Sequence, residues 1–445
     1  MFAAKMGFYY KAPVGPVASP YWVMVFDDFT VTDIAVNSVT AGKDYSMVVG
    51  STGTGTSQRG VLLSIDDMGT IVFQEQMDIQ SNLRKVIITD DANVAVAGTT
   101  SETGSSLPYL GLYDTTGSLI WEKYNSTSFT INGIEWQQTP TGSYNLLAVG
   151  SSSKQMSFDG TTGAINVQNI YGNMGALTSV TATQNGPYSP SYSMGVDTTT
   201  LAYDTVTIIA CNNTGVPYLR RRLGNNTGFT PSSNVRGMFR AFRLQLAAID
   251  ASTNKPVVIL CYTDPGSGSS PAVNYNSNIV LEGTVTGAFQ YVVNNERGFY
   301  AGATQTNNTI WSGKIEDDLA SVDEQRNFYF GTAGTDNTTL TTIAASNDNG
   351  YDSSARYIVG TTDYYGTTKS FIARLPIDGT IPGTGTYGAS GEIHYEATSY
   401  MDSISSLTLT NTNISPNVSS TSNTVTSSAI IMDPTTLANT LTQVP

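Results

Sequence analysis

Few residues of this chain have the types and spacing that catalysis requires. The sequence contains one histidine, His394, which rules out a histidine-rich metal site and leaves a nucleophilic triad only that residue to use. His394 alternates with apolar residues in GEIHYEA, a pattern that predicts an outer strand with a half-exposed, structural imidazole. We therefore predict no enzymatic activity, no metal site and no cofactor.

Paired carboxylates are the other arrangement that could support acid–base chemistry. Three of the four pairs lie where turns are expected, and an aspartate in a turn commonly accepts hydrogen bonds from its own backbone. We interpret them as structural: Asp27 and Asp28, Asp66 and Asp67, Asp90 and Asp91, and Asp317 and Asp318.

The two cysteines, Cys211 and Cys261, each end an apolar run, VTIIAC and PVVILC. Neither belongs to a C-x-x-C pair, which argues against zinc binding and thioredoxin-like chemistry. We expect buried free thiols on equivalent strands of adjacent repeats, and a disulfide is the alternative.

Arginine is concentrated in one part of the chain. The planar guanidinium group can bind a carboxylate through two parallel hydrogen bonds, so an arginine cluster is a candidate docking patch for an acidic partner. The alternative is a solvated loop followed by an edge strand. The cluster is Arg220, Arg221, Arg222, Arg236, Arg240 and Arg243, in a chain with 21 Lys and Arg in total.

Several tyrosines fall in segments where loops are expected. A loop tyrosine is rigid and amphipathic, which suits recognition of glycans or protein surfaces. The alternative is that they are ordinary residues of a chain with 25 tyrosines. The candidates for glycan recognition are Tyr188, Tyr192, Tyr275, Tyr364 and Tyr365.

These candidates have to be positioned by a repeated unit. Within residues 45–76, a strand ends in a glycine, and a tight turn further on ends in a second glycine. In two copies an aromatic residue, Phe73 or Trp121, follows four residues after the second glycine. Regular spacing across most of the chain indicates a repeat architecture. The same spacing of 19 residues separates the glycines of three copies: Gly50 and Gly69, Gly98 and Gly117, and Gly360 and Gly379.

Four short strands in each repeat, with about seven repeats of about 50 residues, predict an all-β protein with a β-propeller fold. A two-sheet β-sandwich array is the alternative. The reference strand that ends at Gly50 has small apolar residues, which suit a place near the ring axis. We expect the aromatic residue after the turn to pack between blades. The equivalent reference strands are expected at 94–98, 146–150, 206–211, 257–263 and 299–303.

A propeller ring must also close. The apolar strand at 20–28 precedes the first repeat, and with strands near 404–410 and 427–432 it would complete one composite blade. The chain thus divides into an N-terminal arm (1–20), the propeller (21–410) and a C-terminal segment (411–445) that partly completes the closing blade. Connections after the reference strands should share one face of the ring: 51–58, 99–108, 264–276 and 361–369.

The chain is acidic and carries few charges. Its net charge is −14 and only 13% of its residues are charged, so its overall field does not attract nucleic acid or anionic lipid. No run approaches the length of a membrane span, and the first 16 residues lack the apolar core of a signal peptide. We expect synthesis in a cytoplasm, no membrane insertion and no nucleic-acid partner.

The segment FIARLPIDGTIPGTGTYG, residues 371–388, resembles one that recurs in propeller-like structural proteins of marine tailed phages, cyanophages in particular. The resemblance covers a single blade. It implies a virion protein of the tail or its fibres, and it carries no catalytic residues. The matching residues are Leu375, Pro376, Asp378, Gly379, Gly385, Thr386 and Tyr387.

These observations predict a structural protein of a phage virion, made in the host cytoplasm and present in several copies. Other virion proteins would hold it through the arginine cluster or the arm, preferably both, and the arm carries the apolar residues Phe2, Phe8 and Tyr9. A surface module that binds host polysaccharide is the second hypothesis. A glycan lyase or hydrolase on a propeller scaffold is the third.

Overall fold

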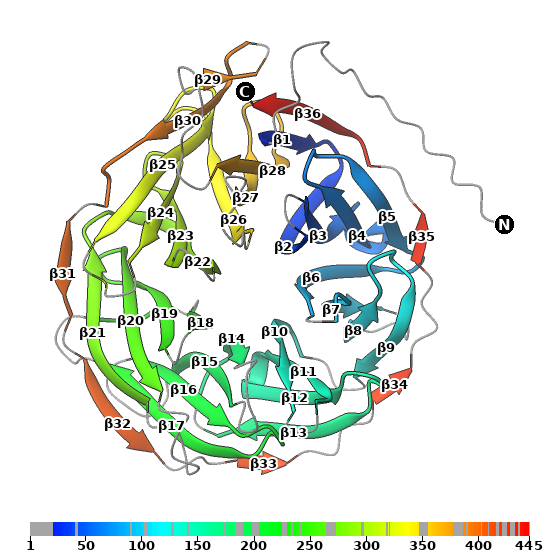
Figure 1. Cartoon of the computed structure of the whole chain (residues 1–445), viewed down its shortest axis with the longest axis vertical. Coiled ribbons are helices and arrows are strands. Elements are labelled where there is room, and N and C mark those ends of the chain that lie inside the picture. Colours follow the sequence, from blue (N-terminus) through cyan, green and yellow to red (C-terminus); the bar gives the residue numbers. More distant parts are fainter. Residues whose placement is uncertain are drawn as a thin grey trace.

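The computed structural model is a ring of seven antiparallel sheets, which confirms the predicted seven-bladed β-propeller (Figure 1). It describes residues 21–444 apart from connecting segments, of which the longest are 183–189, 198–203, 264–272, 347–354 and 377–385. The N-terminal arm with Phe2, Phe8 and Tyr9, and the loop residue Tyr188, lie outside the described residues.

In each blade the strands follow one another from the ring axis outwards. Blades 1 to 3 are β2 (Phe29–Thr40), β3 (Lys43–Thr52), β4 (Arg59–Asp66) and β5 (Ile71–Met77); β6 (Ser81–Ile88), β7 (Val94–Thr100), β8 (Leu107–Tyr113) and β9 (Leu119–Asn125); and β10 (Ile131–Gln138), β11 (Tyr144–Gly150), β12 (Lys154–Asp159) and β13 (Ile165–Tyr171). Blades 4 and 5 are β14 (Leu177–Ala182), β15 (Ser191–Asp197), β16 (Thr205–Cys211) and β17 (Pro217–Gly224); and β18 (Arg236–Arg240), β19 (Arg243–Asp250), β20 (Lys255–Thr263) and β21 (Val273–Leu281). Blades 6 and 7 are β22 (Val285–Asn294), β23 (Gly298–Gln305), β24 (Ile310–Ile315) and β25 (Val322–Phe330); and β26 (Thr338–Ala345), β27 (Ala355–Thr362), β28 (Lys369–Pro376) and β1 (Tyr21–Phe26). Two short 3-10 helices, η1 (Gly55–Ser57) and η2 (Ser151–Ser153), lie between second and third strands.

The strand-end glycines let the innermost strand of a blade pack directly on the second strand. A methyl group on Gly98 would lie 2.0 Å from the carbonyl oxygen of Asn82, and one on Gly150 would lie 1.9 Å from that of Thr130. The innermost strand shifts register at this level, between Leu83 and Lys85 in blade 2. The glycine is therefore required by the close approach of a bulged strand. The reference strands are second in their blades, and the innermost strands are the runs that precede them.

Two of the expected reference strands were assigned wrongly. Residues 206–211 and 257–263 belong to β16 and β20, which are third strands. The second strand of blade 4 is β15, where Gly195 holds the glycine position opposite Leu177. One consequence is that the segment after β20 joins a third strand to a fourth, so its expected position with the other three loops is also wrong.

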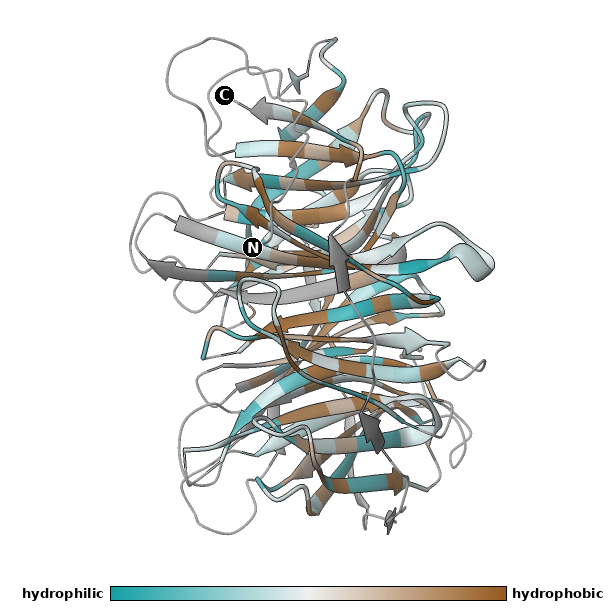
Figure 2. Ribbon diagram, turned by 90° about the vertical axis from the view of Figure 1, so that its right-hand side faces the viewer, coloured by the Kyte–Doolittle hydropathy of each residue, from teal (hydrophilic) through white to brown (hydrophobic). Residues whose placement is uncertain are grey.

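The core lies between blades. Seven large apolar clusters each combine residues of two neighbouring blades, and the apolar residues coloured brown in Figure 2 lie mainly on strands. Trp121 is 7% exposed, and its Nε1 donates to the carbonyl of Gly160 in blade 3 over 2.9 Å. A methyl group on the turn glycine Gly163 (φ +67°) would lie 2.7 Å from the Trp121 ring. The predicted packing of this aromatic between blades is confirmed.

The ring closes through the N-terminal strand. β1 lies between β28 and β36 (Asn439–Val444), and its antiparallel pairing with β28 runs from Trp22 opposite Arg374 to Phe26 opposite Ser370. The closing role predicted for residues 20–28 is therefore confirmed.

The C-terminal strands do not form one composite blade as expected. After β28 the chain turns back and runs around the outside of the ring in the reverse direction, and it adds an outer strand to every blade (Figure 1). We call residues 393–444 the C-terminal belt. The belt strands are β30 (Ile393–Ala397), which also pairs with β29 (Thr386–Tyr387), β31 (Ile404–Ser406), β32 (Thr410–Ile414), β33 (Val418–Ser420), β34 (Val425–Ser427), β35 (Met432–Pro434) and β36. In this order they pair with β25, β21, β17, β13, β9, β5 and β1.

The close approach at Gly98 leads to a stability prediction. Gly98→Ala should lower the free energy of unfolding by about 3 kcal/mol or more, because the added methyl overlaps a backbone carbonyl. Gly142→Ala is the control: its φ is +81° but nothing lies within 4 Å of the new methyl, so only about 1–2 kcal/mol of backbone strain is expected. Chemical denaturation measures both. Equal losses would contradict the proposed packing.

Candidate functional site

Two arginines of the cluster lie inside blade 4. Arg220 and Arg222 are 1% and 9% exposed, and both form ion pairs with Asp197, which is 2% exposed. Arg220 also donates to the carbonyl of Gly172 over 2.9 Å. Burial lowers the pKa of Arg220. The neighbouring positive charge of Arg222 lowers this pKa further, whereas the negative charge of Asp197 raises it. The expectation that these two arginines lie on the surface is wrong, because a buried carboxylate neutralises them within the sheet.

The remaining arginines of the cluster do not lie together on one surface. Arg221 is half-buried on β17, and Arg236 is half-buried on the innermost strand β18. Arg240 and Arg243 pair with each other across β18 and β19, and their side chains lie outside the described residues. The cluster is thus divided between β17 of blade 4 and the first two strands, β18 and β19, of blade 5.

The tyrosine candidates also separate. Tyr192 is not in a loop: it lies on β15 and is fully buried. Tyr275 lies on β21, and its side chain is outside the described residues. Tyr364 and Tyr365 lie in the turn between β27 and β28, and Tyr365 is 40% exposed.

Tyr365 forms an exposed aromatic platform beside a lysine. Its ring packs edge-to-face on Tyr364 with 5.1 Å between centroids, and the Lys369 Nζ lies 5.2 Å from its centroid. Lys369 also binds Asp27 Oδ1 over 2.5 Å. Burial, with the nearby charge of Glu392, raises the pKa of Tyr365 to about 12, so the hydroxyl stays a neutral donor at physiological pH.

The loops near Tyr365 share one face of the ring with the connections between blades. The Asp363 amide donates to Asn337 O, which links the β27–β28 turn to the connection that enters blade 7. In blade 1 the Ser81 amide likewise donates to Gln58 O. The predicted common face is confirmed for these loops, and we call it the loop face. The Asp/Gly turns lie at the opposite ends of the strands, and we call that side of the ring the turn face.

His394 and the cysteines have structural surroundings. The His394 ring stacks on Tyr329 with 4.4 Å between centroids, and its Nδ1 lies 3.5 Å from Glu396. Cys211 and Cys261 are free and fully buried, as expected, and burial raises the pKa of both thiols. Neither thiol is therefore a ready nucleophile.

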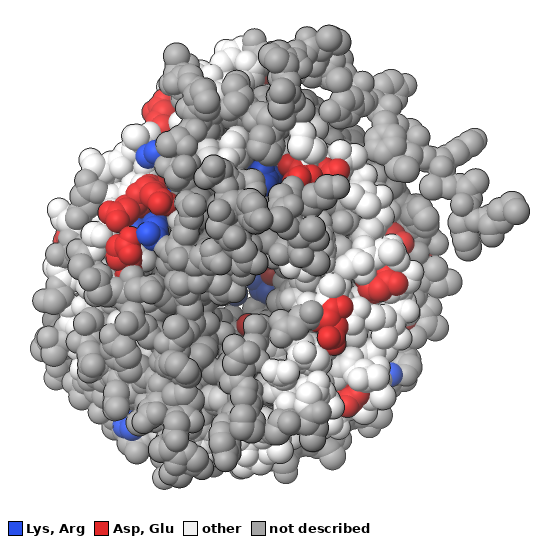
Figure 3. Space-filling view, viewed as in Figure 1, with Lys and Arg blue, Asp and Glu red and all other residues white. Residues whose placement is uncertain are grey.

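A charged group at the ring axis was not singled out from the sequence. Asp33 on β2 accepts from the Lys85 Nζ over 3.4 Å and from the Val86 amide over 3.3 Å, both across to blade 2. Burial lowers the pKa of Lys85 to about 8, and the nearby Arg236 of blade 5 acts in the same direction. Basic and acidic atoms are visible at the small central opening (Figure 3). The signal in the sequence was charged residues within otherwise apolar innermost strands, as in VTDIAV and LRKVII.

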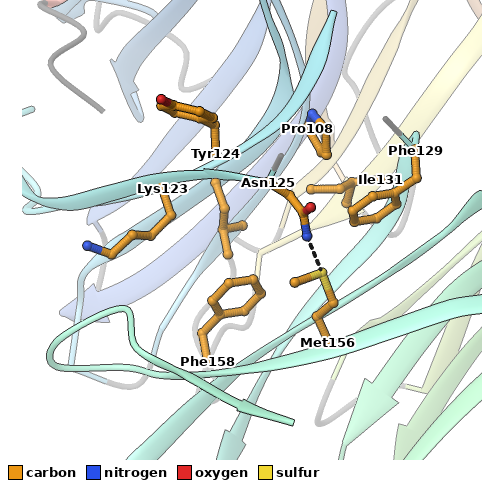
Figure 4. A pocket seen from close by; sticks show the side chains of 9 residues that line it. Pro108, Lys123, Tyr124, Asn125, Phe129, Ile131, Met156 and Phe158 are labelled. Carbon is orange, nitrogen blue, oxygen red and sulfur yellow. Dashed lines mark hydrogen bonds between the residues drawn. The ribbon is translucent and has the colours of Figure 1, made fainter. Parts of the chain in front are cut away.

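One small apolar pocket lies between blades 2 and 3 (Figure 4). Its walls include Phe129, Ile131, Met156 and Phe158, and Asn125 Nδ2 donates to Met156 Sδ over 3.5 Å. These apolar side chains also belong to the core cluster between the two blades. The pocket is a gap in that packing, and we assign no ligand to it.

Metal and membrane features were searched over the described part of the chain. There, no group of three or more His, Cys, Asp or Glu side chains could hold a metal ion, and no helix is long and apolar enough to cross a membrane. No protein-family model matches the chain, and no curated protein sequence is significantly similar to it.

The buried ion pairs of blade 4 lead to a second prediction. Asp197→Ala should destabilise the protein by about 3–5 kcal/mol, because it leaves two buried guanidinium groups without their carboxylate. Asp28→Ala removes an exposed carboxylate and should change stability by less than about 0.5 kcal/mol. A small effect of Asp197→Ala in chemical denaturation would show that solvent reaches the arginines.

Proposed function

We propose that the chain is a non-enzymatic structural component of a phage virion, in the tail or a tail fibre, that acts through contacts with other virion proteins. The observation that carries this proposal is the C-terminal belt. It pairs the outer edge of all seven blades, while β1 closes the ring. Each blade therefore gains a belt strand of only three to six residues, and very short edge strands give other chains little to pair with, which suits a particle that must persist outside a cell. The resemblance of residues 371–388 to phage structural proteins points the same way.

The turn face offers a surface for such contacts. Three blades expose large apolar residues directly after the turn between their third and fourth strands. Single exposed apolar residues are common, but here they recur within three residues of the turn glycines Gly69, Gly117 and Gly215, which favours a shared docking rim. They are Val72 in blade 1, Leu119 and Ile120 in blade 2, and Val216 in blade 4, exposed by 45% to 55%.

Two experiments test the structural role. Mass spectrometry of purified particles of the encoding phage should detect the chain in several copies, and its absence would refute the proposal. Within the phage, a triple variant Val72→Asp, Ile120→Asp and Val216→Asp should keep its fold and lose most incorporation into particles. The matched control is Thr116→Asp, on the same turn of blade 2 but without an apolar contact surface. Normal incorporation of the triple variant would contradict docking through this rim.

Tyr365 supports recognition of a host-surface glycan as a second role. An exposed ring with a charged amine and a carboxylate beside it matches the stacking and hydrogen-bonding needs of a sugar. Tyr365→Ala should weaken binding to host polysaccharide at least tenfold. Tyr400→Ala, which changes another exposed tyrosine, should leave binding unchanged. Equal effects of the two variants, or no binding by the wild type, would contradict this role.

A further inference from the structure

The longest belt strand, β36, forms the outer edge of blade 7. It ends the strand order β26-β27-β28-β1-β36, and within the described part of the chain it pairs only with β1 (Figure 1). β36 has six residues and β32 has five, whereas β31, β33, β34 and β35 have three each, and β30 pairs with β29 on its outer side. Three residues are a poor template for another chain, but six are a usual strand length.

The sequence of β36 lacks the features that protect a sheet edge. Charged residues, proline and bulges commonly prevent other chains from pairing there. The strand, NTLTQV, has no charged residue and no proline, and its register with β1 is regular. Asn439 and Thr440 are exposed, and Leu441 is half-buried against the apolar cluster between blades 7 and 1. This edge can therefore accept a further strand.

Half of the β36 residues direct their backbone groups away from β1. The Asp27 amide donates to Ala438 O over 3.1 Å, which continues the register of Phe26 opposite Asn439. Hydrogen-bonded and non-hydrogen-bonded pairs alternate along antiparallel strands, so every second residue of β36 turns both its N–H and its C=O outwards. The outward-facing residues are Asn439, Leu441 and Gln443, and those bonded to β1 are Thr440, Thr442 and Val444.

The N-terminal arm has the sequence of a strand that could fill this edge. The arm precedes β1 and lies outside the described residues. Its residues 2–11, FAAKMGFYYK, alternate in the manner of a half-buried strand. The two lysines suit contact with another copy of this acidic chain, whose net charge is −14. One face would carry Phe2, Ala4, Met6, Phe8 and Tyr10, and the other Ala3, Lys5, Gly7, Tyr9 and Lys11.

We propose that residues 2–11 of one copy add a strand to the outer edge of β36 in a second copy of this chain. Backbone hydrogen bonds to the outward-facing residues would supply affinity, and the apolar side chains of the arm would extend the surface that Leu441 begins. The second copy is a specific partner for the structural role proposed above. The test uses purified protein, so its outcome is separate from detection of the chain in phage particles.

The connection between the arm and β1 favours a second copy over the same chain. All strand pairs of the described sheets are antiparallel, and a strand antiparallel to β36 runs parallel to β1. A parallel connection within one chain crosses a face of the sheet and takes a dozen or more residues. Only residues 12–20 are available, three of them proline. Both faces of β1 are also covered, since Trp22 to Phe26 are at most 7% exposed.

Sedimentation equilibrium of the purified full chain tests the edge. The wild type should self-associate as its concentration rises. Asn439→Pro removes an amide that points away from β1, so it should weaken association at least tenfold and leave thermal stability unchanged. Thr440→Pro is the matched control, because it removes an amide bonded to β1 and should lower thermal stability. Equal losses of stability in the two variants would contradict the outward assignment and overturn the proposal.

Substitutions in the arm test the strand pattern. Phe8→Asp places a charge on the apolar face and should weaken self-association at least tenfold. Tyr9→Asp changes the neighbouring aromatic on the other face and should have a much smaller effect. Both positions precede the ring, so thermal stability should stay that of the wild type. Equal effects of Phe8→Asp and Tyr9→Asp on association would contradict strand pairing by residues 2–11.

A mixing experiment distinguishes a second copy from the chain's own arm. Chains without residues 2–12 keep the β36 edge, and Asn439→Pro chains keep the arm. Neither should self-associate, but together they should form a 1:1 complex in which the amides of Asn439, Leu441 and Gln443 of the arm-deleted chain exchange slowly. A monomeric wild type, or association that survives Asn439→Pro, would overturn the proposal. A monomeric wild type whose β36 amides lose protection on arm deletion would assign the arm to its own chain.

Discussion

The ring depends on how closely the innermost strand of each blade can approach the second. Where glycine stands at the end of the second strand, a carbonyl oxygen of the innermost strand occupies the space of a side chain. The innermost strand bulges at that level, and the bulged residue reaches the next blade: Thr32 Oγ1 donates to Leu83 O, and Asn132 Nδ2 to Leu177 O. One close contact within a blade thus sets the contact between blades.

The blades are joined in a different way at the outer rim of the ring. Near the axis, side chains and bulges join neighbouring blades, whereas at the rim the belt adds one short strand to each sheet through backbone pairing. The belt begins at blade 6 and ends on β1, the strand that completes blade 7 from the other end of the chain. Opening the ring at blade 7 would therefore require β1 to separate from β28. This linkage supports the structural role proposed above.

Local features of the sequence predicted the repeat but not the long-range pairing. The spacing of Gly98, Gly117 and Trp121 was informative because each of these residues makes the same contact in several blades. The reference strands of blades 4 and 5 were assigned to the third strands, VTIIAC and VVILC, because these are strongly apolar. The true second strand of blade 4, β15, is more polar, and its Ser191 and Ser193 are buried. The belt was not predicted, since backbone pairing of Ser- and Thr-rich segments leaves no side-chain pattern. Burial of Arg220 was missed because its partner Asp197 lies two strands away.

The central claim is that β1 closes the ring and that the C-terminal belt pairs with the outer strand of every blade. Hydrogen–deuterium exchange of the full chain tests it most directly, through peptides that cover β5, β9, β13 and β17. If the belt pairs with these strands, their amides should exchange slowly in the full chain, and deletion of residues 398–445 should speed exchange there far more than in β3 and β7. Fast exchange of the four outer strands in the intact protein, or no change on deletion, would contradict the account.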